Sequence, residues 1–352
     1  MFVIIFKIKN MIYRASQKRY ELMHYKNCGS SGLKLPLISL GLWHNFGGKK
    51  INSESKKVLF KAFDCGITHF DLANNYGPPY GSAEINFGKI LKNDLSKYRD
   101  ELIISSKAGY DMWEGPYGEW GSKKHIIASC NQSLKRMGLD YVDIFYSHRF
   151  DPNTPLEETA DALEHIYKSG KALYIGVSSY SSKKTNEMYN LLKKRNIKLF
   201  IHQPSYSLIN RWIEKDLTKT LINKGVGCIA FSPLAQGMLS EKYFKGIPKL
   251  SRANQKITSL DKKLITQKNI KMIFELNKIA KKRGQSLAQM AIAWVLNNKA
   301  VTSALIGARN VNQLQENINA IKNLNFSQTE ISLINKTARD GGVNIWLASS
   351  SY

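Results

Sequence analysis

An acid, a phenol, a lysine and a histidine accompany three consecutive predicted strands of this sequence. Asp71 lies in the mostly apolar stretch THFDLA, and Tyr76 lies in the turn-forming stretch NNYGPP directly after it. Lys107 is near the end of the next apolar stretch, LIISSKA, and His148 closes the one after that, YVDIFYSH. A carboxylate can hold a cation in place and a phenol can give up a proton, so these residue types together suggest proton-transfer chemistry.

Each of the four residues also has an ordinary structural explanation. Asp71 could cap a turn, Tyr76 could pack on proline, and His148 could be satisfied within the core. Lys107 is more informative, because a lysine that ends an apolar strand needs a counter-charge, for which Asp71 is the obvious candidate. Four such residues on three consecutive strand ends are much harder to explain by packing, so we interpret them as a catalytic group.

Short apolar strands alternate with helices along the chain. After a hairpin formed by residues 25–28 and 33–36, about eight strands are predicted, at residues 37–42, 69–73, 102–108, 141–147, 173–178, 199–202, 227–231 and 304–306. They are β-branched and lack polar alternation, as in a parallel sheet covered on both faces. This pattern and length predict an α/β fold, a (β/α)8 TIM barrel with an N-terminal β-hairpin and a C-terminal helical tail.

The chain is expected to contain one main domain. No GxGxxG motif follows a predicted strand, which disfavours a Rossmann domain, and no linker divides the alternating elements. We therefore expect one barrel domain over residues 23–352 after an extension over residues 1–22. MFVIIFKIKN is too poor in charge to make a convincing secretory signal, and Met11 and Met23 are alternative starts, so the segment fits an over-extended reading frame as well as a targeting peptide.

Bulk composition argues against several classes of protein. The net charge of +25 raises the question of nucleic acid or an anionic membrane, but the lysines are spread over nearly every predicted helix, with no basic block interleaved with stacking aromatics. No apolar run approaches the length of a membrane span. Four well-separated cysteines, without a CxxC pair, predict neither a metal site nor a disulfide framework. We expect a cytoplasmic protein that binds small molecules, without nucleic acid, membrane or metal.

From about Met11 to its end the chain resembles the aldo-keto reductases, and because the resembling lead segment RASQKRYELMHY starts near Met11, residues 1–10 are expected not to be native. The resembling motifs are long, and they include THFDLANNYGPPYGSAE, IISSKAGYDMW, QSLKRMGLDYVDIFYSHR, SGKALYIGVSSYS, GCIAFSPLAQGMLS and LIGARNVNQLQEN. The tetrad of that family is an Asp and a Tyr after the second barrel strand, a Lys after the third and a His after the fourth, which Asp71, Tyr76, Lys107 and His148 match. The chain most resembles the bacterial L-glyceraldehyde 3-phosphate reductases, a branch similar to the β subunits of voltage-gated potassium channels.

The resemblance implies reduction of small aldehydes, such as L-glyceraldehyde 3-phosphate and methylglyoxal, to alcohols. Such a reduction needs a hydride on carbon and a proton on the developing alkoxide, and Tyr76 would be the general acid. A phenol with a pKa near 10 is a slow donor at neutral pH, so we expect Lys107 to lower that pKa while Asp71 keeps the lysine charged. His148 would donate a hydrogen bond to the carbonyl oxygen and orient the substrate.

The resemblance also implies that NADPH binds extended across the barrel mouth. Ser178, Ser179 and Gln203 would hold the carboxamide, and Phe231 would stack on the nicotinamide; Ser179 and Phe231 depart from the Asn and the Tyr or Trp common in the family. The other matched positions are Trp43, Ser232, Leu234, Gly237 and Lys242 along the cofactor, and Arg252, Gly307, Arg309, Gln313, Glu316 and Asn317 around the adenosine and its 2′-phosphate. Arg309 precedes a predicted helix start, so guanidinium and helix N-terminus could share one phosphate.

The substrate pocket and the overall role leave alternatives open. The substrate residues would be Trp43, Tyr76, Tyr110, Trp113, His148 and Arg149, although loop tryptophans, including Trp120, can equally seal a barrel rim. Arg149 could meet a substrate phosphate or pair with Asp151 as a clamp, and we favour the clamp. Rival functions are a non-catalytic NADPH-binding redox-sensing subunit and a phosphate-handling barrel enzyme that catalyses another reaction. The channel subunits carry Asn where this chain has His148, which favours the enzyme, and relatives imply a homo-oligomer, a tetramer or octamer.

Overall fold

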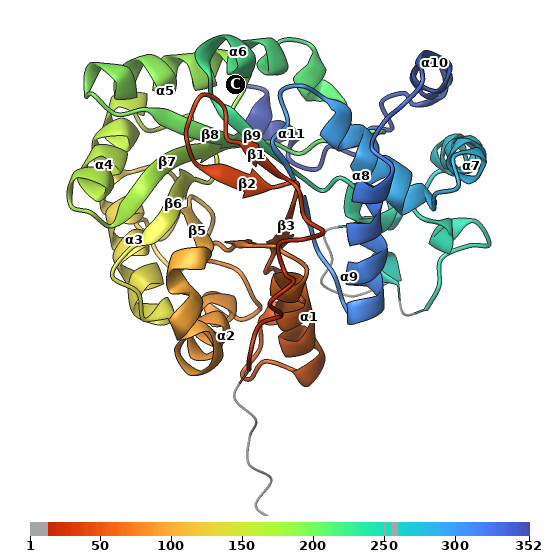
Figure 1. The fold of residues 1–352 in the computed structure, drawn as a ribbon. Coiled ribbons are helices and arrows are strands. Elements are labelled where there is room, and N and C mark those ends of the chain that lie inside the picture. The colour runs from red at the N-terminus through yellow and green to blue at the C-terminus, as the bar shows by residue number, and fades with distance from the viewer. Residues whose placement is uncertain (1–12, 250, 255–259) are drawn as a thin grey trace, which may run out of the picture.

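Eight parallel strands close into a barrel with helices around it (Figure 1). The structure is a computed structural model and describes residues 13–249, 251–254 and 260–352, so residues 1–10 lie outside the described part. The predicted barrel is confirmed, with strand bounds shifted by one or two residues. The strands are β3 (Ile38–Gly41), β4 (His69–Asp71), β5 (Ile103–Ala108), β6 (Val142–Ser147), β7 (Ala172–Ser178), β8 (Leu199–Gln203), β9 (Gly227–Phe231) and β10 (Ser303–Ile306).

Helices follow the strands and pack on the outside of the barrel. Those that follow β3 to β8 are α1 (Ser53–Asp64), α2 (Ser82–Ile90), α3 (Lys123–Met137), α4 (Leu156–Lys168), α5 (Ser182–Lys194) and α6 (Leu217–Lys224). A long loop then leads from β9 to α7 (Gln267–Lys282) and α8 (Leu287–Asn297), and α9 (Val311–Ile318) follows β10. Side chains cap several helix starts: Asn52 accepts a hydrogen bond from the Ser55 amide, and Ser286 forms a capping box with Gln289.

The β-hairpin closes one end of the barrel. Its strands β1 (Tyr25–Asn27) and β2 (Lys34–Pro36) pair antiparallel. Cys28 and Leu35 are fully buried in the same apolar cluster as the inward-facing Ile144 and Tyr146 of the barrel. The hairpin approaches β9 so closely that a Cβ on Gly227 would overlap the Cys28 sulfur. The first residue of β9 must therefore be glycine for the hairpin to pack against the barrel. One end of the barrel is thus filled, and ligands can enter only from the other.

The strand order places β10 beside β3, so the last barrel strand closes on the first. Side chains alternate between the barrel interior and the helices, and residues two apart in a strand therefore share a face. In β4 this pairs His69 with Asp71, and in β5 it pairs Ser105 with Lys107; all four side chains are completely buried. The interior of the barrel therefore carries polar groups on neighbouring strands, directly below its open end.

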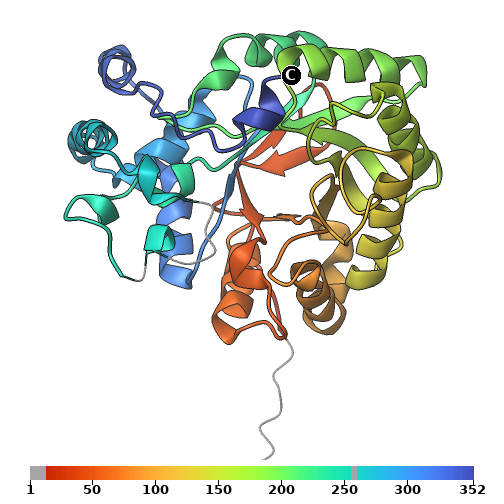
Figure 2. The ribbon, with the colours of Figure 1, turned by 180° about the vertical axis from the view of Figure 1, so that it is seen from behind.

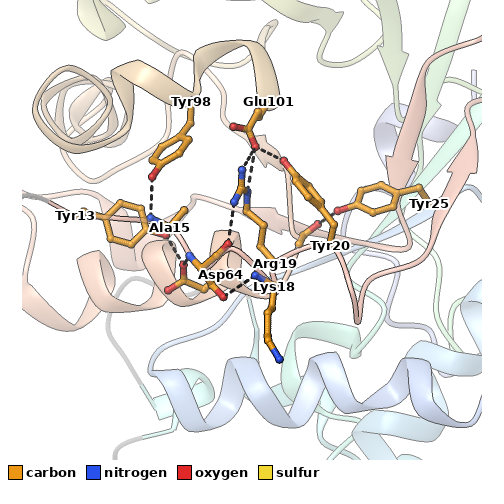
Figure 3. Close-up of polar contacts among 11 residues, drawn as sticks. Tyr13, Ala15, Lys18, Arg19, Tyr20, Tyr25, Asp64, Tyr98 and Glu101 are labelled. Atoms are coloured by element: carbon orange, nitrogen blue, oxygen red, sulfur yellow. Dashed lines mark hydrogen bonds and ion pairs between the residues drawn. The ribbon is translucent and has the colours of Figure 1, made fainter.

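The segment before the hairpin is attached by hydrogen bonds to the outside of α1 and to the 3-10 helix η3 (Ser96–Glu101). Figure 3 shows Tyr13 donating a hydrogen bond to Asp64, at 2.7 Å, and the Ala15 amide donating to the Tyr98 hydroxyl, at 2.9 Å. Arg19 donates to Glu101 through Nη2, at 2.6 Å, and through Nε, at 3.0 Å. The predicted extension is thus ordered over its described residues and packs on the barrel.

The predicted C-terminal tail consists of α10 (Gln328–Thr337) and the short α11 (Leu347–Ser350). In both views α10 lies beside α7, outside the ring of helices (Figures 1 and 2). Figure 2 shows α11 on the opposite face of the barrel from the hairpin. Among the described helices, none combines the length and the apolar character that crossing a bilayer would require.

Candidate active site

Asp71 and Lys107 form a fully buried ion pair at the open end of the barrel. The Lys107 ammonium lies 2.5 Å from Asp71 Oδ2, as the counter-charge argument predicts, and it also donates to the Leu72 carbonyl oxygen, at 2.6 Å. Burial lowers the pKa of Lys107, and the Asp71 carboxylate opposes this effect by favouring the charged form. Because neither side chain is exposed, the pair is screened very little by solvent.

The second carboxylate oxygen of Asp71 is held by neutral donors. Ser105 Oγ donates to Oδ1, at 2.7 Å, and Gln203 Nε2 donates to the same atom, at 3.1 Å. Gln203 was expected to hold a cofactor carboxamide; since its amide nitrogen is committed to Asp71, its amide oxygen is the group left to accept a hydrogen bond. The strands β5 and β8 thus orient the acid from two sides.

Tyr76 lies half-buried in the loop after β4, above this pair. Its ring centroid is 5.0 Å from Lys107 Nζ, and the ring stacks on Trp43 with centroids 5.6 Å apart. Burial raises the pKa of Tyr76 well above its ordinary value of 10, and Asp71 and Tyr110 act in the same direction. The expected net lowering of this pKa by Lys107 is not found, because burial outweighs an ammonium charge that is shared with the Asp71 carboxylate and a carbonyl oxygen.

His148 follows β6 and lies on the other side of Tyr76, with ring centroids 6.1 Å apart. It also meets the Tyr110 ring edge to face, at 4.7 Å and 86°. Burial lowers the pKa of His148 well below its ordinary value of 6.5, and the charges of Lys107 and Arg149 act in the same direction. The imidazole is therefore neutral near pH 7, with one N–H to donate; among the described residues its Nδ1 has no hydrogen-bond partner.

A pocket of about 330 Å³ opens above these residues. The structure brings together on its wall most of the residues predicted for catalysis, cofactor and substrate: Trp43, Asp71, Tyr76, Tyr110, His148, Ser178, Ser179, Gln203, Phe231, Ser232, Leu234, Gly237, Lys242, Gly307, Arg309 and Gln313. Lys107 lies beneath this lining, in contact with Asp71. The pocket therefore connects the positions predicted to be catalytic with the loop after β9 and the start of α9.

Several predicted residues lie apart from the pocket wall. Within the described part of the chain, Trp113, Glu316 and Asn317 are not in the lining; Trp113 packs instead on His125, with ring centroids 4.9 Å apart. Glu316 is exposed on α9, whereas Asn317 is buried there. Arg252 begins a short 3-10 helix, and its side chain lies outside the described part of the structure.

Arg149 is a clamp, with a different partner from the one expected. Its guanidinium is ion-paired with Glu119 and donates to the Gly109 carbonyl oxygen, at 2.9 Å. It also lies over the ring of Trp120, 3.6 Å from the centroid. The pairing with Asp151 does not occur, because Asp151 accepts the Gly121 amide and the Thr154 hydroxyl instead. Arg149 lies outside the described pocket lining.

The sequence did not single out several wall residues. Trp346, from the tail before α11, is one of them, and it meets Phe231 edge to face with centroids 4.6 Å apart. Because Trp346 is far from every predicted strand in the sequence, the order of the strands could not indicate its position on the pocket wall. The other missed positions are Gly41, Asn45, Asn75, Gln236, Leu305, Ile306 and Ala308, whereas His44 and Pro233 stand at strand ends where the site was expected. Most of these adjoin a predicted residue, so the order of strand ends could have indicated them.

The described residues contain no group of three or more His, Cys, Asp or Glu side chains that could hold a metal ion. All four cysteines are buried and free.

A parallel barrel with these four residues at its open end defines a class of oxidoreductase. Residues 37–339 match the Aldo/keto reductase family, and the chain belongs to this family. It is 57% identical over 344 residues to an L-glyceraldehyde 3-phosphate reductase of Escherichia coli K12, covering 97% of this chain and 99% of that protein. It is also 36% identical over 305 residues to a probable voltage-gated potassium channel subunit beta of Arabidopsis thaliana, covering 85% and 91% of the two chains. The predicted family resemblance is confirmed.

Proposed function

We propose that this protein uses NADPH to reduce small aldehydes to alcohols, with Tyr76 as the general acid. The observation that carries the proposal is the buried Lys107–Asp71 pair beneath Tyr76, with the His148 ring 6.1 Å from the Tyr76 ring in the same pocket. Burying a charged pair costs desolvation energy, and the position of this pair beside a proton donor supports a functional role. The 57% identity to a named reductase supports the same function.

The pocket wall has the composition that an extended anionic cofactor requires. Its described lining includes two cations, Lys242 and Arg309, and one acid, Asp71, which Lys107 already neutralises. Arg309 is exposed and precedes α9, where the first backbone amides of the helix favour negative charge. Phe231 presents an aromatic ring at the end of β9. These groups fit a nicotinamide dinucleotide and, through Arg309, its 2′-phosphate.

The cofactor would be held by residues at and after the ends of five strands, β3, β7, β8, β9 and β10. Gln203 would accept a hydrogen bond from the carboxamide through its amide oxygen, beside Ser178 and Ser179, and Phe231 would pack on the nicotinamide. The remaining contacts would come from Trp43, Ser232, Leu234, Gly237, Lys242, Gly307, Arg309 and Gln313 in the wall, and from the predicted positions Arg252, Glu316 and Asn317. Asn317 has a buried amide nitrogen without a hydrogen-bond partner among the described residues, which supports a ligand contact near α9.

The catalytic roles follow from the charges and the burial of the four residues. Bound NADPH would supply the hydride. Tyr76 keeps its proton at neutral pH because burial raises its pKa, and it gives the proton up only to a strong base such as the developing alkoxide. Lys107 stabilises the resulting phenolate, and Asp71 holds the ammonium in place. Neutral His148 donates its N–H to the carbonyl oxygen and orients the aldehyde.

The substrates would be small aldehydes such as L-glyceraldehyde 3-phosphate and methylglyoxal. Trp43 and Tyr110 form aromatic walls on either side of Tyr76 and His148. Arg149 and Trp113 lie outside the described pocket lining, so they would support the pocket wall rather than touch the substrate. The four buried thiols support a reducing, cytoplasmic location, and we further propose a homo-oligomer, a tetramer or octamer, which light scattering of the purified protein would test.

A non-catalytic NADPH-binding subunit is the alternative. The 36% identity to a probable potassium channel subunit beta favours it, whereas the assembled proton-donor group favours the enzyme. The enzyme and the non-catalytic subunit are distinguished by whether the protein reduces aldehydes and whether this activity is lost when the Tyr76 hydroxyl is removed.

The decisive test is NADPH consumption by purified protein with each aldehyde, comparing wild type with Tyr76→Phe. Tyr80→Phe is the matched control, because Tyr80 lies in the same loop and is 53% exposed. We expect turnover by wild type and the control, and a loss of roughly 10²- to 10⁴-fold in Tyr76→Phe with NADPH affinity retained. Tight NADPH binding without reduction of either aldehyde would support the sensing subunit, and failure to bind NADPH would refute the proposal.

A further inference from the structure

A chain of buried hydrogen bonds crosses the interior of the barrel and ends on Asp71. Ser303 Oγ in β10 is 2.7 Å from Ser39 Oγ in β3, and Ser39 Oγ is 3.0 Å from His69 Nδ1 in β4. On its other side, His69 Nε2 is 3.0 Å from Ser105 Oγ in β5. Ser105 then donates to Asp71 Oδ1, at 2.7 Å. None of these side chains is exposed, so no solvent competes for their donors and acceptors.

The carboxylate fixes the direction of every bond in this chain. Asp71 can only accept, so Ser105 must give it its single hydroxyl proton. His69 Nε2 must then be the donor to Ser105. Burial lowers the pKa of His69 to about 4, with Lys107 acting in the same direction and Asp71 opposing, so the imidazole is neutral and carries only this one proton. Nδ1 is therefore an acceptor from Ser39, which in turn accepts from Ser303.

We propose that His69 is a positioning residue for this site, a neutral imidazole protonated at Nε2 that holds the Ser105 hydroxyl toward Asp71 and so keeps the Asp71–Lys107 pair charged. This inference rests on the proposed function for its catalytic consequence, but the direction of the chain does not depend on it. All the donors point the same way, and each bond in such a series polarises the next. The negative charge on Asp71 is thereby stabilised from the side opposite Lys107.

A histidine that merely fills the core would not need this arrangement. If His69 were protonated, Nδ1 would donate to Ser39. Ser39 would then have to donate its own proton to Ser303, so the two bonds on this side of the ring would reverse direction. The charged groups that act on His69 are Asp71 and Lys107, and they shift its pKa in opposite directions. The direction is therefore set by hydrogen-bond capacity within the barrel, which a variant can alter.

The first test is the tautomer of His69, read from the nitrogen signals of protein labelled with ¹⁵N-histidine. The signals are assigned by their loss in His69→Gln, and exposed His165→Gln serves as control. A neutral ring with its proton on Nε2 at pH 7 supports the proposal. A proton on Nδ1, or an imidazolium at this pH, would overturn it. This result is independent of any activity, so it stands apart from the test of the proposed function.

The second test compares His69→Met, which removes both ring nitrogens, with His69→Gln, whose amide can replace the Nε2 donor. We expect His69→Met to lower kcat roughly tenfold, about the effect of one hydrogen bond to a charged group, and to move the acid limb of the pH–kcat profile to higher pH. His69→Gln should restore both. If the two variants behave alike, or the acid limb does not move, the positioning role is refuted. Should His69→Met fail to fold, Ser105→Ala must show the same shift of the acid limb.

Discussion

Two cation–carboxylate pairs of this molecule have opposite surroundings. Lys107 and Asp71 lie inside the barrel with no exposed surface, whereas Arg19 and Glu101 join the N-terminal segment to η3 with side chains 15% and 33% exposed. Arg19 also donates to the Ser16 carbonyl oxygen, and it lies over the rings of Tyr20, Phe63 and Tyr98. Figure 3 shows Glu101 in contact with both Arg19 and Tyr20. The N–H donors and the planar faces of the Arg19 guanidinium both help to attach the N-terminal segment to the barrel.

Lys107 differs from Arg19 in its burial and in its neighbour. Two of its three N–H donors have partners among the described residues, Asp71 and the Leu72 carbonyl oxygen, and the ammonium lies beneath the Tyr76 ring. The Arg19–Glu101 pair is partly exposed and attaches one segment to the barrel, whereas the Lys107–Asp71 pair is fully buried and lies beside a phenol. The comparison teaches that complete burial, together with an adjacent proton donor, distinguishes the pair in the site from a pair that attaches a segment.

The largest expected effect comes from Lys107→Met. Loss of one partner leaves the Asp71 carboxylate buried without its counter-charge, so we expect the free energy of unfolding to fall by about 3–5 kcal/mol and aldehyde reduction to fall by roughly 10³-fold or more. Denaturant unfolding and NADPH consumption measure the two losses, with the exposed Lys219→Met as control.

The double variant Lys107→Met, Asp71→Asn separates the two losses. It should recover much of the stability and none of the activity, because no buried charge is then left unpaired. Recovery of activity would mean that the pair serves only the fold, and the contrast with Arg19–Glu101 would disappear.

Acid should weaken the barrel interior through its buried histidines. Burial lowers the pKa of His69 to about 4 and that of His202 to about 3, while each titrates near 6.5 in the unfolded chain. Below pH 6.5 the unfolded state therefore binds more protons, and the free energy of unfolding falls by about 1.4 kcal/mol per pH unit for each histidine until its folded pKa is reached. Urea unfolding between pH 7 and pH 4.5 should show a slope smaller by about this amount in His69→Gln. An equal slope in the variant would contradict the buried, neutral state of His69.

Arg19→Met should have a smaller effect. Glu101 is partly exposed and can be hydrated once its partner is lost, so we expect a loss of about 1 kcal/mol in unfolding free energy and no change in kcat. The exposed Arg14→Met, in the same segment, should change neither. A drop in kcat with Arg19→Met would show that the N-terminal segment communicates with the site and would break the comparison.

The smallest effect is expected for substrate choice in Arg149→Met. Because Glu119 already neutralises this guanidinium, removing it should lower kcat/KM for L-glyceraldehyde 3-phosphate and methylglyoxal together and leave their ratio within about twofold. A selective loss of more than about tenfold for the phosphorylated aldehyde would instead identify Arg149 as a phosphate ligand.

The sequence predicted those features that depend on local pattern. The eight strands, the hairpin and the Asp71–Lys107 contact followed from apolar runs, turn residues and one lysine that needed a counter-charge. Two features could not be predicted, because they depend on contacts between loops: the pairing of Arg149 with Glu119 and the position of Trp346 on the pocket wall. The pKa of Tyr76 was also misjudged in direction, since burial outweighs a charge that is shared with Asp71.

The pairing of β3 with β10 has a consequence for how the protein is made. Ser39 and Ser303, which meet across this seam, are separated by 264 residues. A ribosome that adds 5–20 residues per second needs roughly 10–50 s to cover that interval. Throughout it, β3 presents an unpaired parallel edge, a surface prone to aggregation that chaperones would have to shield. The nascent chain therefore waits for its last barrel strand before it can complete the site at which it would work.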